Sequence, residues 1–104
     1  MTNARPAKVV DLLARVRDCV NCGNYRDTTH ARIRQKERRI ILPEIIQVLS
    51  TGTHEKSKDR IDEAFNEWNY SIRGKTIDGR MLRIIISFDE ETKLLIITAI
   101  CLES

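Results

Sequence analysis

The chain has 104 residues, a length that suits one domain and leaves too little apolar material for two cores. Hydrophobic residues make up 41% of it and charged residues 32%, which is typical of a globular domain rather than a disordered chain. No apolar run approaches the roughly 18 residues of a membrane helix, and the N-terminus lacks a secretory signal pattern. We therefore expect one globular domain in the cytoplasm.

The net charge of +3 is small, but the charge is unevenly distributed. The segment from Arg26 to Arg39 holds six cations and two acids. Much of the acid lies further along the chain, in Asp62, Glu63, Glu67, Asp89, Glu90 and Glu91. A concentrated basic segment predicts a surface for an anionic partner, and RNA is the partner that we expect.

The N-terminal part of the chain has the apolar period of a helix. Apolar residues recur at three- and four-residue steps over residues 6–22, with Pro6 in the first turn. Gly23 suits a left-handed C-terminal cap. These signals predict an amphipathic helix from about Pro6 to Cys22.

Two more helices are expected before the strands. Thr28 or Thr29 caps a second helix over about residues 29–39, which has few apolar residues and must be largely exposed or laid across a ligand site. A third helix begins near Pro43 and ends at residues 51–52, with isoleucine, valine and leucine on its buried face.

The C-terminal half changes to the two-residue period of strands. The polar stretch 54–59 is a candidate edge strand, and residues 59–65 form a loop or one helical turn. The expected strands and turns are, in order, strand 68–73, turn 78–79, strand 81–88, turn 89–93 and strand 94–102. The predicted fold class is α+β, with three N-terminal helices packed on a three- or four-stranded antiparallel sheet.

The second helix carries the strongest chemical signal. His30 and Arg34 are four residues apart and share a helix face, and Arg38 continues the row. Arginine contacts phosphate through two parallel hydrogen bonds, and histidine exchanges a proton near neutral pH. Arg32 and Arg39 add positive charge nearby. The same pattern also fits a solvated helix face without a ligand.

The strand half adds a second basic group. Its candidate residues are Tyr70, Arg73, Lys75, Arg80 and Arg83. A hairpin brings Arg73 and Arg83 side by side, where two cations repel unless an anion or a carboxylate lies between them. A bound phosphate explains this pair, and so does a salt bridge to Glu67 or Asp78.

Other polar residues give weaker signals. Metal-free RNA cleavage needs a base, a proton donor and cations, but spacing does not show that such groups converge. His54 and Lys56 are more typical of a loop than of a catalyst. The C-x-x-C pair Cys19 and Cys22 lacks the further ligands that zinc requires, so we interpret both as core or surface thiols. We expect no metal and no cofactor.

Short motifs resemble known bacterial families. His30-Ala31-x-x-Arg34, residues 37–40 and Ile96-Ile97-Thr98 resemble a widespread bacterial family of small domains with the pattern H-A-x-x-R…E-R-G-I, in which Arg39 replaces the glycine. Residues 10–29 are similar to the MqsR toxins of toxin–antitoxin pairs. Both groups resemble the RelE-type toxin superfamily, small helices-then-sheet proteins. Many of these cut mRNA without a metal and are neutralised by a partner antitoxin.

The resemblance implies a metal-independent mRNA endoribonuclease that acts by transesterification, with a cognate antitoxin as partner. Lys56 falls where MqsR toxins carry a catalytic lysine. Their active tyrosine falls near Met81 or Leu82 here, and their C-terminal lysine has no counterpart. The expected catalytic residues are therefore His30, Arg34, Lys56, Tyr70 and Arg83. The expected RNA-binding residues are Arg32, Arg38, Arg39, Arg73, Lys75 and Arg80.

Two alternatives remain on the same fold. One is a non-catalytic RNA-binding module, whose affinity falls with salt. The other is a protein-interaction domain that holds an acidic partner against its basic helix.

Overall fold

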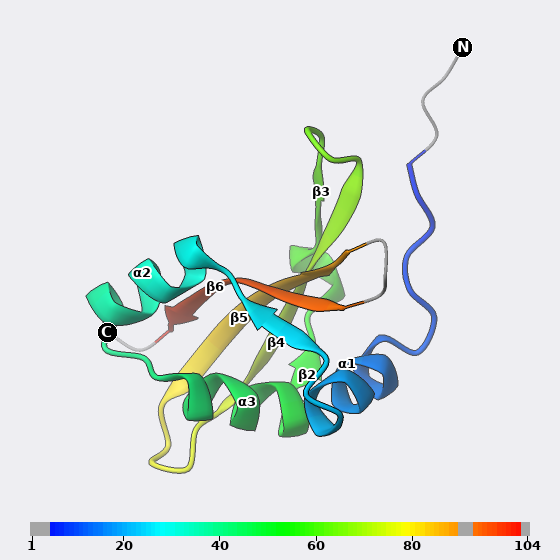
Figure 1. The fold of residues 1–104 in the computed structure, drawn as a ribbon. Helices are drawn as coiled ribbons and strands as arrows, with labels where there is room; N and C mark the ends of the chain where they lie inside the picture. Colours follow the sequence, from blue (N-terminus) through cyan, green and yellow to red (C-terminus); the bar gives the residue numbers. More distant parts are fainter. Residues whose placement is uncertain (1–4, 90–92, 103–104) are drawn as a thin grey trace.

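A computed structural model describes residues 5–89 and 93–102 (Figure 1). Its helices are α1 (Leu12–Asn21), α2 (Thr29–Arg38) and α3 (Leu42–Thr51), with a short 3₁₀ turn η1 (Lys56–Lys58). Its strands are β1 (Tyr25–Asp27), β2 (Thr53–His54), β3 (Arg60–Asp62), β4 (Glu67–Lys75), β5 (Met81–Phe88) and β6 (Leu94–Cys101). Within the described ranges, no helix is long and apolar enough to cross a membrane.

The sheet has six strands and is mixed, so the prediction of a three- or four-stranded antiparallel sheet is wrong. Its order is β1-β6-β5-β4-β2, with β3 also paired to β4, and β1 runs parallel to β6. The long strands β4, β5 and β6 lie close to the expected ranges. The prediction missed β1 and β3 because strands of three residues are too short to show a two-residue period.

The helices do not all cover one face. In Figure 1, α1 and α3 lie together below the sheet, whereas α2 lies at its edge beside β6. The core lies between the sheet and the α1–α3 layer, and its fully buried members include Val16, Ile45, Leu49, Ile72, Ile84 and Ile86. The other side of the central strands carries no helix in the described part of the chain, and we refer to it as the open face.

The first helix is shorter than predicted. It begins at Leu12 instead of near Pro6, after Asp11 in the left-handed conformation with φ 51°. The preceding residues lie along β4 and are held there, because Trp68 Nε1 donates to Pro6 O at 2.7 Å and Val9 N donates to the Tyr70 hydroxyl at 2.8 Å. Tertiary contacts therefore override the helical pattern of this segment.

The other helix ends follow the predicted capping chemistry. Gly23 follows α1 with φ 69°, and the Thr28 hydroxyl accepts from Ala31 N at 3.2 Å at the start of α2. Pro43 lies in the first turn of α3. Arg39 ends α2 in the left-handed conformation with φ 55°, which explains why the resembling pattern has glycine there.

The structure agrees with only some of the predictions for the remaining turns and for the edge strand. Gly79 has φ 88° in the turn between β4 and β5, as the Asp78-Gly79 pair predicts. The candidate edge strand at 54–59 is only partly right, because Thr53–His54 forms β2 and then η1 begins. The expected turn at 89–93 falls partly outside the described residues.

Candidate nucleic-acid interface

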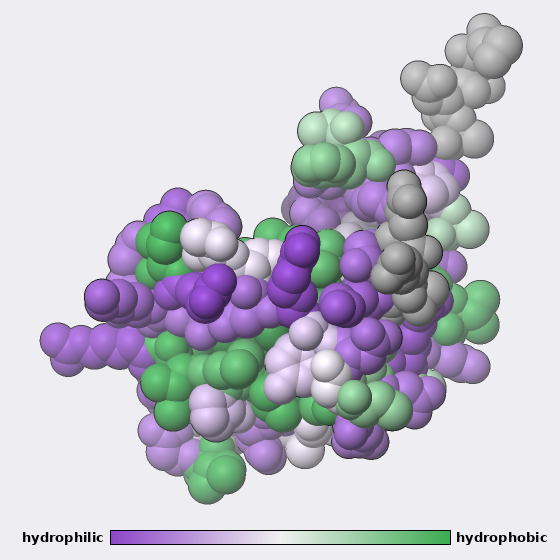
Figure 2. All heavy atoms as spheres, in the orientation of Figure 1, coloured by the Kyte–Doolittle hydropathy of each residue, from purple (hydrophilic) through white to green (hydrophobic). Residues whose placement is uncertain are grey.

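α2 presents a basic surface at the edge of the sheet. Only Ala31 and Gln35 of this helix are buried. His30 and Arg32 are exposed, and Arg34 makes one ion pair, to Glu37 at 3.3 Å, in which both side chains are well exposed. Figure 2 shows a band of hydrophilic residues over α2 that continues toward the middle of the molecule. The positive charge of this helix is therefore accessible to a ligand.

Arg38 connects the basic row to the open face. Its Nη1 donates to Thr98 Oγ1 at 3.2 Å and to Ala99 O at 2.7 Å. Ala99 is fully buried toward the helices, so Thr98, its neighbour in β6, lies on the open face. Two of the motifs that resemble the bacterial family, residues 37–40 and residues 96–98, are far apart in the chain but contact each other here.

Arg73 and Arg83 lie opposite each other on the open face, as the predicted hairpin requires. Arg83 Nε donates to Glu55 Oε1 at 2.7 Å and its Nη2 to Oε2 at 3.1 Å, while Arg73 Nη1 lies 3.9 Å from the same carboxylate. Glu55 also accepts from Ser71 Oγ at 2.9 Å. A salt bridge therefore relieves the repulsion, and its acid is neither Glu67 nor Asp78.

These contacts shift two pKa values in opposite directions. Hydrogen bonds from Arg83 hold the pKa of the Glu55 carboxyl below its ordinary value, although burial opposes this. The same bonds raise the pKa of the Arg83 guanidinium. Glu55 is thus a charged acceptor that positions Arg83. The sequence does not predict this contact between Glu55 and Arg83.

The register of the sheet aligns these groups in one line across the open face. Thr98 of β6 pairs with Ile85 of β5, and Ile85 pairs with Ser71 of β4. Arg38 contacts the first of these residues and Glu55 the last. We name the line Arg38–Thr98–Ile85–Ser71–Glu55 the transverse row. It leads from α2 to η1 across β6, β5 and β4, whose two spacings of about 4.8 Å each make about 10 Å of sheet.

The other predicted RNA-binding residues are dispersed. Arg80 is tied to Glu44 of α3 at 2.5 Å and donates to Arg39 O at 3.3 Å. Arg39 and Lys75 are exposed. Arg80 therefore fastens the β4–β5 turn to α3.

Tyr70 lies in the core and is 3% exposed. Its ring packs edge-on against His54 and Phe88, and its hydroxyl accepts from Val9 N. Burial raises the pKa of this phenol. Tyr70 faces the helix side of the sheet, so it does not join Arg83 on the open face.

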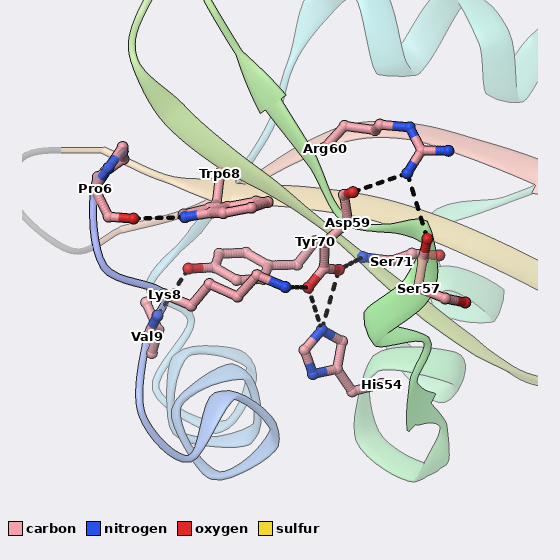
Figure 3. A network of polar contacts seen from close by, with 10 residues as sticks. All are labelled: Pro6, Lys8, Val9, His54, Ser57, Asp59, Arg60, Trp68, Tyr70 and Ser71. Atoms are coloured by element: carbon pink, nitrogen blue, oxygen red, sulfur yellow. Dashed lines mark hydrogen bonds and ion pairs between the residues drawn. The ribbon is translucent and has the colours of Figure 1, made fainter. Parts of the chain in front are cut away.

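A second polar cluster surrounds Asp59 at the β2 edge (Figure 3). Its carboxylate accepts from His54 Nε2 at 2.8 Å, Lys8 Nζ at 2.9 Å and Ser71 N at 3.1 Å. Lys56, exposed in η1, lines a cavity of about 480 Å³ together with His54 and residues 8–13. From the sequence, His54 is more typical of a loop than of a catalyst, and neither Asp59 nor Lys8 carries a signal, because residues from separate segments form this cluster only on folding.

Apart from Tyr70 in the core, the predicted catalytic residues lie in three places. His30 and Arg34 are on α2, Arg83 is in the middle of the open face, and Lys56 is at the β2 edge. No direct contact joins these three places within the described ranges, although the transverse row spans the distance between them.

The cysteines form no ligand set. Cys19 is buried, Cys22 is exposed and Cys101 is half-buried. Burial raises the pKa of the Cys19 thiol. Among the residues that the structure describes, no three His, Cys, Asp or Glu side chains are arranged to hold a metal ion.

The sequence matches the family described as "Domain of unknown function (DUF4258)" over residues 28–100. The chain belongs to this family, since the match covers more than half of its 104 residues. The matched region contains α2, the transverse row and the Asp59 cluster apart from Lys8, whereas α1 lies outside it. No curated protein and no solved structure matches the chain.

Proposed function

We propose that this protein binds single-stranded RNA across α2 and the open face of its sheet, and cuts it there as a metal-independent endoribonuclease of the RelE and MqsR toxin type. The observation that carries this proposal is the transverse row. It gives an extended strand a path from the basic helix, past two arginines, to Lys56.

The charges along this path favour a phosphate backbone. The ion pair of Arg34 is exposed, so a phosphate exchanges with Glu37 at little cost. Glu55 binds Arg83 through Nε and Nη2, so the two N–H groups of Nη1 take no part in this pair. Ile85 and Ile100, half-buried beside it, provide apolar surface against which a base or ribose packs.

Cleavage would follow the chemistry implied by the resemblance. The 2′-oxygen attacks the adjacent phosphorus, and the 5′-oxygen leaves, so that the products carry a 2′,3′-cyclic phosphate and a 5′-hydroxyl. A cognate antitoxin belongs to this proposal. An acidic segment that lies along α2 would cover the basic row and block access to RNA.

A second candidate is RNA binding without cleavage. It is favoured by the Glu55 carboxylate, which already neutralises Arg83 and part of the charge on Arg73. The buried Tyr70 supports it too, because its hydroxyl does not reach the open face.

The decisive experiment incubates purified protein with 5′-labelled single-stranded RNA in the presence of EDTA, with and without ribosomes. We expect discrete fragments that end in a 2′,3′-cyclic phosphate. The double variant His30→Ala and Arg34→Ala, purified in parallel, should cut more slowly because it binds RNA less tightly. Equal cutting by both preparations would indicate a contaminating nuclease, and intact RNA in every reaction would remove the enzyme proposal.

A further inference from the structure

Asp59 carries a charge that the fold has buried and fully paired. Its side chain is 1% exposed, and both carboxylate oxygens accept hydrogen bonds from Lys8, His54 and the Ser71 amide. Burying a carboxylate is costly unless it is surrounded by donors in this way. Asp59 is therefore a fixed acceptor that holds its three partners in place.

The fixed acceptor orients the His54 ring. Nε2 lies 2.8 Å and 3.0 Å from the two Asp59 oxygens, so Nε2 carries the proton and Nδ1 is the acceptor in the neutral imidazole. The ring also packs edge-on against Tyr70, with centroids 5.9 Å apart. Figure 3 shows Nδ1 on the side of the ring away from Asp59. Within residues 5–89 and 93–102, no hydrogen-bond partner is recorded for this nitrogen.

A cleft adjoins this histidine. His54, Lys56 and residues 8–13 line its volume of about 480 Å³. Leu13 and the exposed Val10 contribute apolar surface and Lys56 contributes positive charge, whereas Lys8 is paired with Asp59 and Asp11 adds one acid. The cleft has room for a nucleotide, and its lining combines apolar contacts for a base or ribose with a cation, Lys56, for a phosphate.

We infer that His54 is the base of the RNA cleavage proposed above, with Asp59 as its positioning residue and Lys56 as the proton donor. This inference rests on that function and moves the chemical step from α2 to the β2 edge. The His54 ring lies on the helix side with Tyr70, so RNA that follows the transverse row on the open face turns around the two-residue strand β2 to reach it. α2 then binds the backbone of the RNA but takes no part in bond cleavage.

The proposed step balances without a cofactor. His54 Nδ1 takes the proton of the 2′-hydroxyl as the 2′-oxygen forms its bond to phosphorus. The bond from phosphorus to the 5′-oxygen breaks, and the leaving oxygen receives a proton from the Lys56 ammonium. Proton exchange through water then returns a proton from the imidazolium to Lys56, which restores both groups.

The two histidines of the chain differ in whether a carboxylate orients the ring, and a general base requires such orientation. His30 is exposed on α2, and the described part of the chain provides no carboxylate that orients it. His54 is mostly buried, with 12% of its side chain exposed, and its ring is fixed from one side. Orientation of this kind raises the rate of proton transfer because the acceptor nitrogen is held toward the substrate.

The test compares His54→Ala with His30→Ala in the RNA assay with EDTA. We expect His54→Ala to lower kcat by about 10²–10⁴-fold, the usual contribution of a general base. Imidazole added to the buffer should restore part of this activity, because it enters the space left by the side chain. His30→Ala should mainly raise KM.

The other outcomes separate this inference from the function on which it rests. The assignment of His54 as the base would be overturned if His54→Ala kept its activity, or if it folded, lost activity and was not restored by imidazole. Cleavage by the wild-type protein would still support the proposed function in both cases. If His54→Ala does not fold, His54→Gln keeps a donor for Asp59, and activity in that variant would overturn the inference. Intact RNA with the wild-type protein would overturn both proposals.

Discussion

The two edges of the sheet hold their charged groups in opposite ways. At the α2 edge, consecutive turns of one helix carry cations whose partners are weak: Arg34 makes an exposed ion pair, and Arg38 donates to uncharged oxygens. At the β2 edge, a single buried carboxylate, Asp59, gathers groups from the N-terminal segment, β2 and β4. An exposed charge is easily exchanged for a ligand, whereas a buried charge fixes its neighbours. The first edge therefore suits binding and the second suits positioning.

The largest expected effect is on the buried carboxylate. Asp59→Ala should lower the free energy of unfolding by about 3–5 kcal/mol, because Lys8, His54 and the Ser71 amide all lose their acceptor. Denaturant titration measures this change. Lys8→Ala is the matched control and should cost less, since Lys8 is 39% exposed. A loss below about 1 kcal/mol in Asp59→Ala would show that the two edges do not differ as described.

Glu55, between the two edges, should have the next largest effect. Glu55→Gln should cost about 1.5–3 kcal/mol at neutral pH, because it weakens charge-assisted bonds to Arg83 and Ser71.

The same variant should also change the acid dependence of stability. Since folding lowers the pKa of Glu55, its contribution is present above the ordinary value of 4.5 and is lost as the pH falls through the lower folded value. Acid titration of stability should therefore be shallower below pH 4.5 in Glu55→Gln than in the wild type. Glu37→Gln, in the exposed pair, serves as the control, and equal slopes for the two variants would contradict this account.

A smaller effect of opposite sign is expected at the end of α2. Arg39 has φ 55°, which costs a side chain about 1 kcal/mol that glycine avoids. Arg39→Gly should therefore raise the midpoint of thermal unfolding. Arg38→Gly, one residue earlier and inside the helix, should lower it. A lower midpoint in Arg39→Gly would mean that the arginine side chain contributes more than its backbone costs.

The smallest effect on stability is expected in the basic row itself. Arg34→Ala should change the free energy of unfolding by no more than about 0.5 kcal/mol, because its pair with Glu37 is exposed. RNA affinity should nevertheless fall, and the slope of log affinity against log salt should decrease by about 1. Unchanged affinity and slope would remove α2 from the RNA-binding surface.

The sequence predicts the features that are continuous along the chain. The ranges of α2, α3, β5 and β6 follow from capping residues and apolar period, and these signals are local. The basic row is equally visible, since His30, Arg34 and Arg38 fall on successive turns of one helix. The short strands β1 and β3 carry no such period, so the sequence does not predict that the sheet is mixed.

The candidate site at the β2 edge could not be predicted for a related reason. Lys8 meets the His54–Asp59 pair only because the N-terminal segment lies extended over β4 instead of continuing α1. The signal that remains in the sequence is the short spacing of His54, Lys56 and Asp59 in a polar stretch. That spacing gains meaning only when burial of the carboxylate is known.

The most direct test of the central claim follows the backbone amides of ¹⁵N-labelled protein by NMR during titration with a short RNA that carries 2′-deoxyribose and so resists cleavage. The account predicts shift changes in α2 and at Thr98, Ile85 and Ser71, which continue to His54. Changes confined to the α1 and α3 side, or absent from the open face, would contradict it.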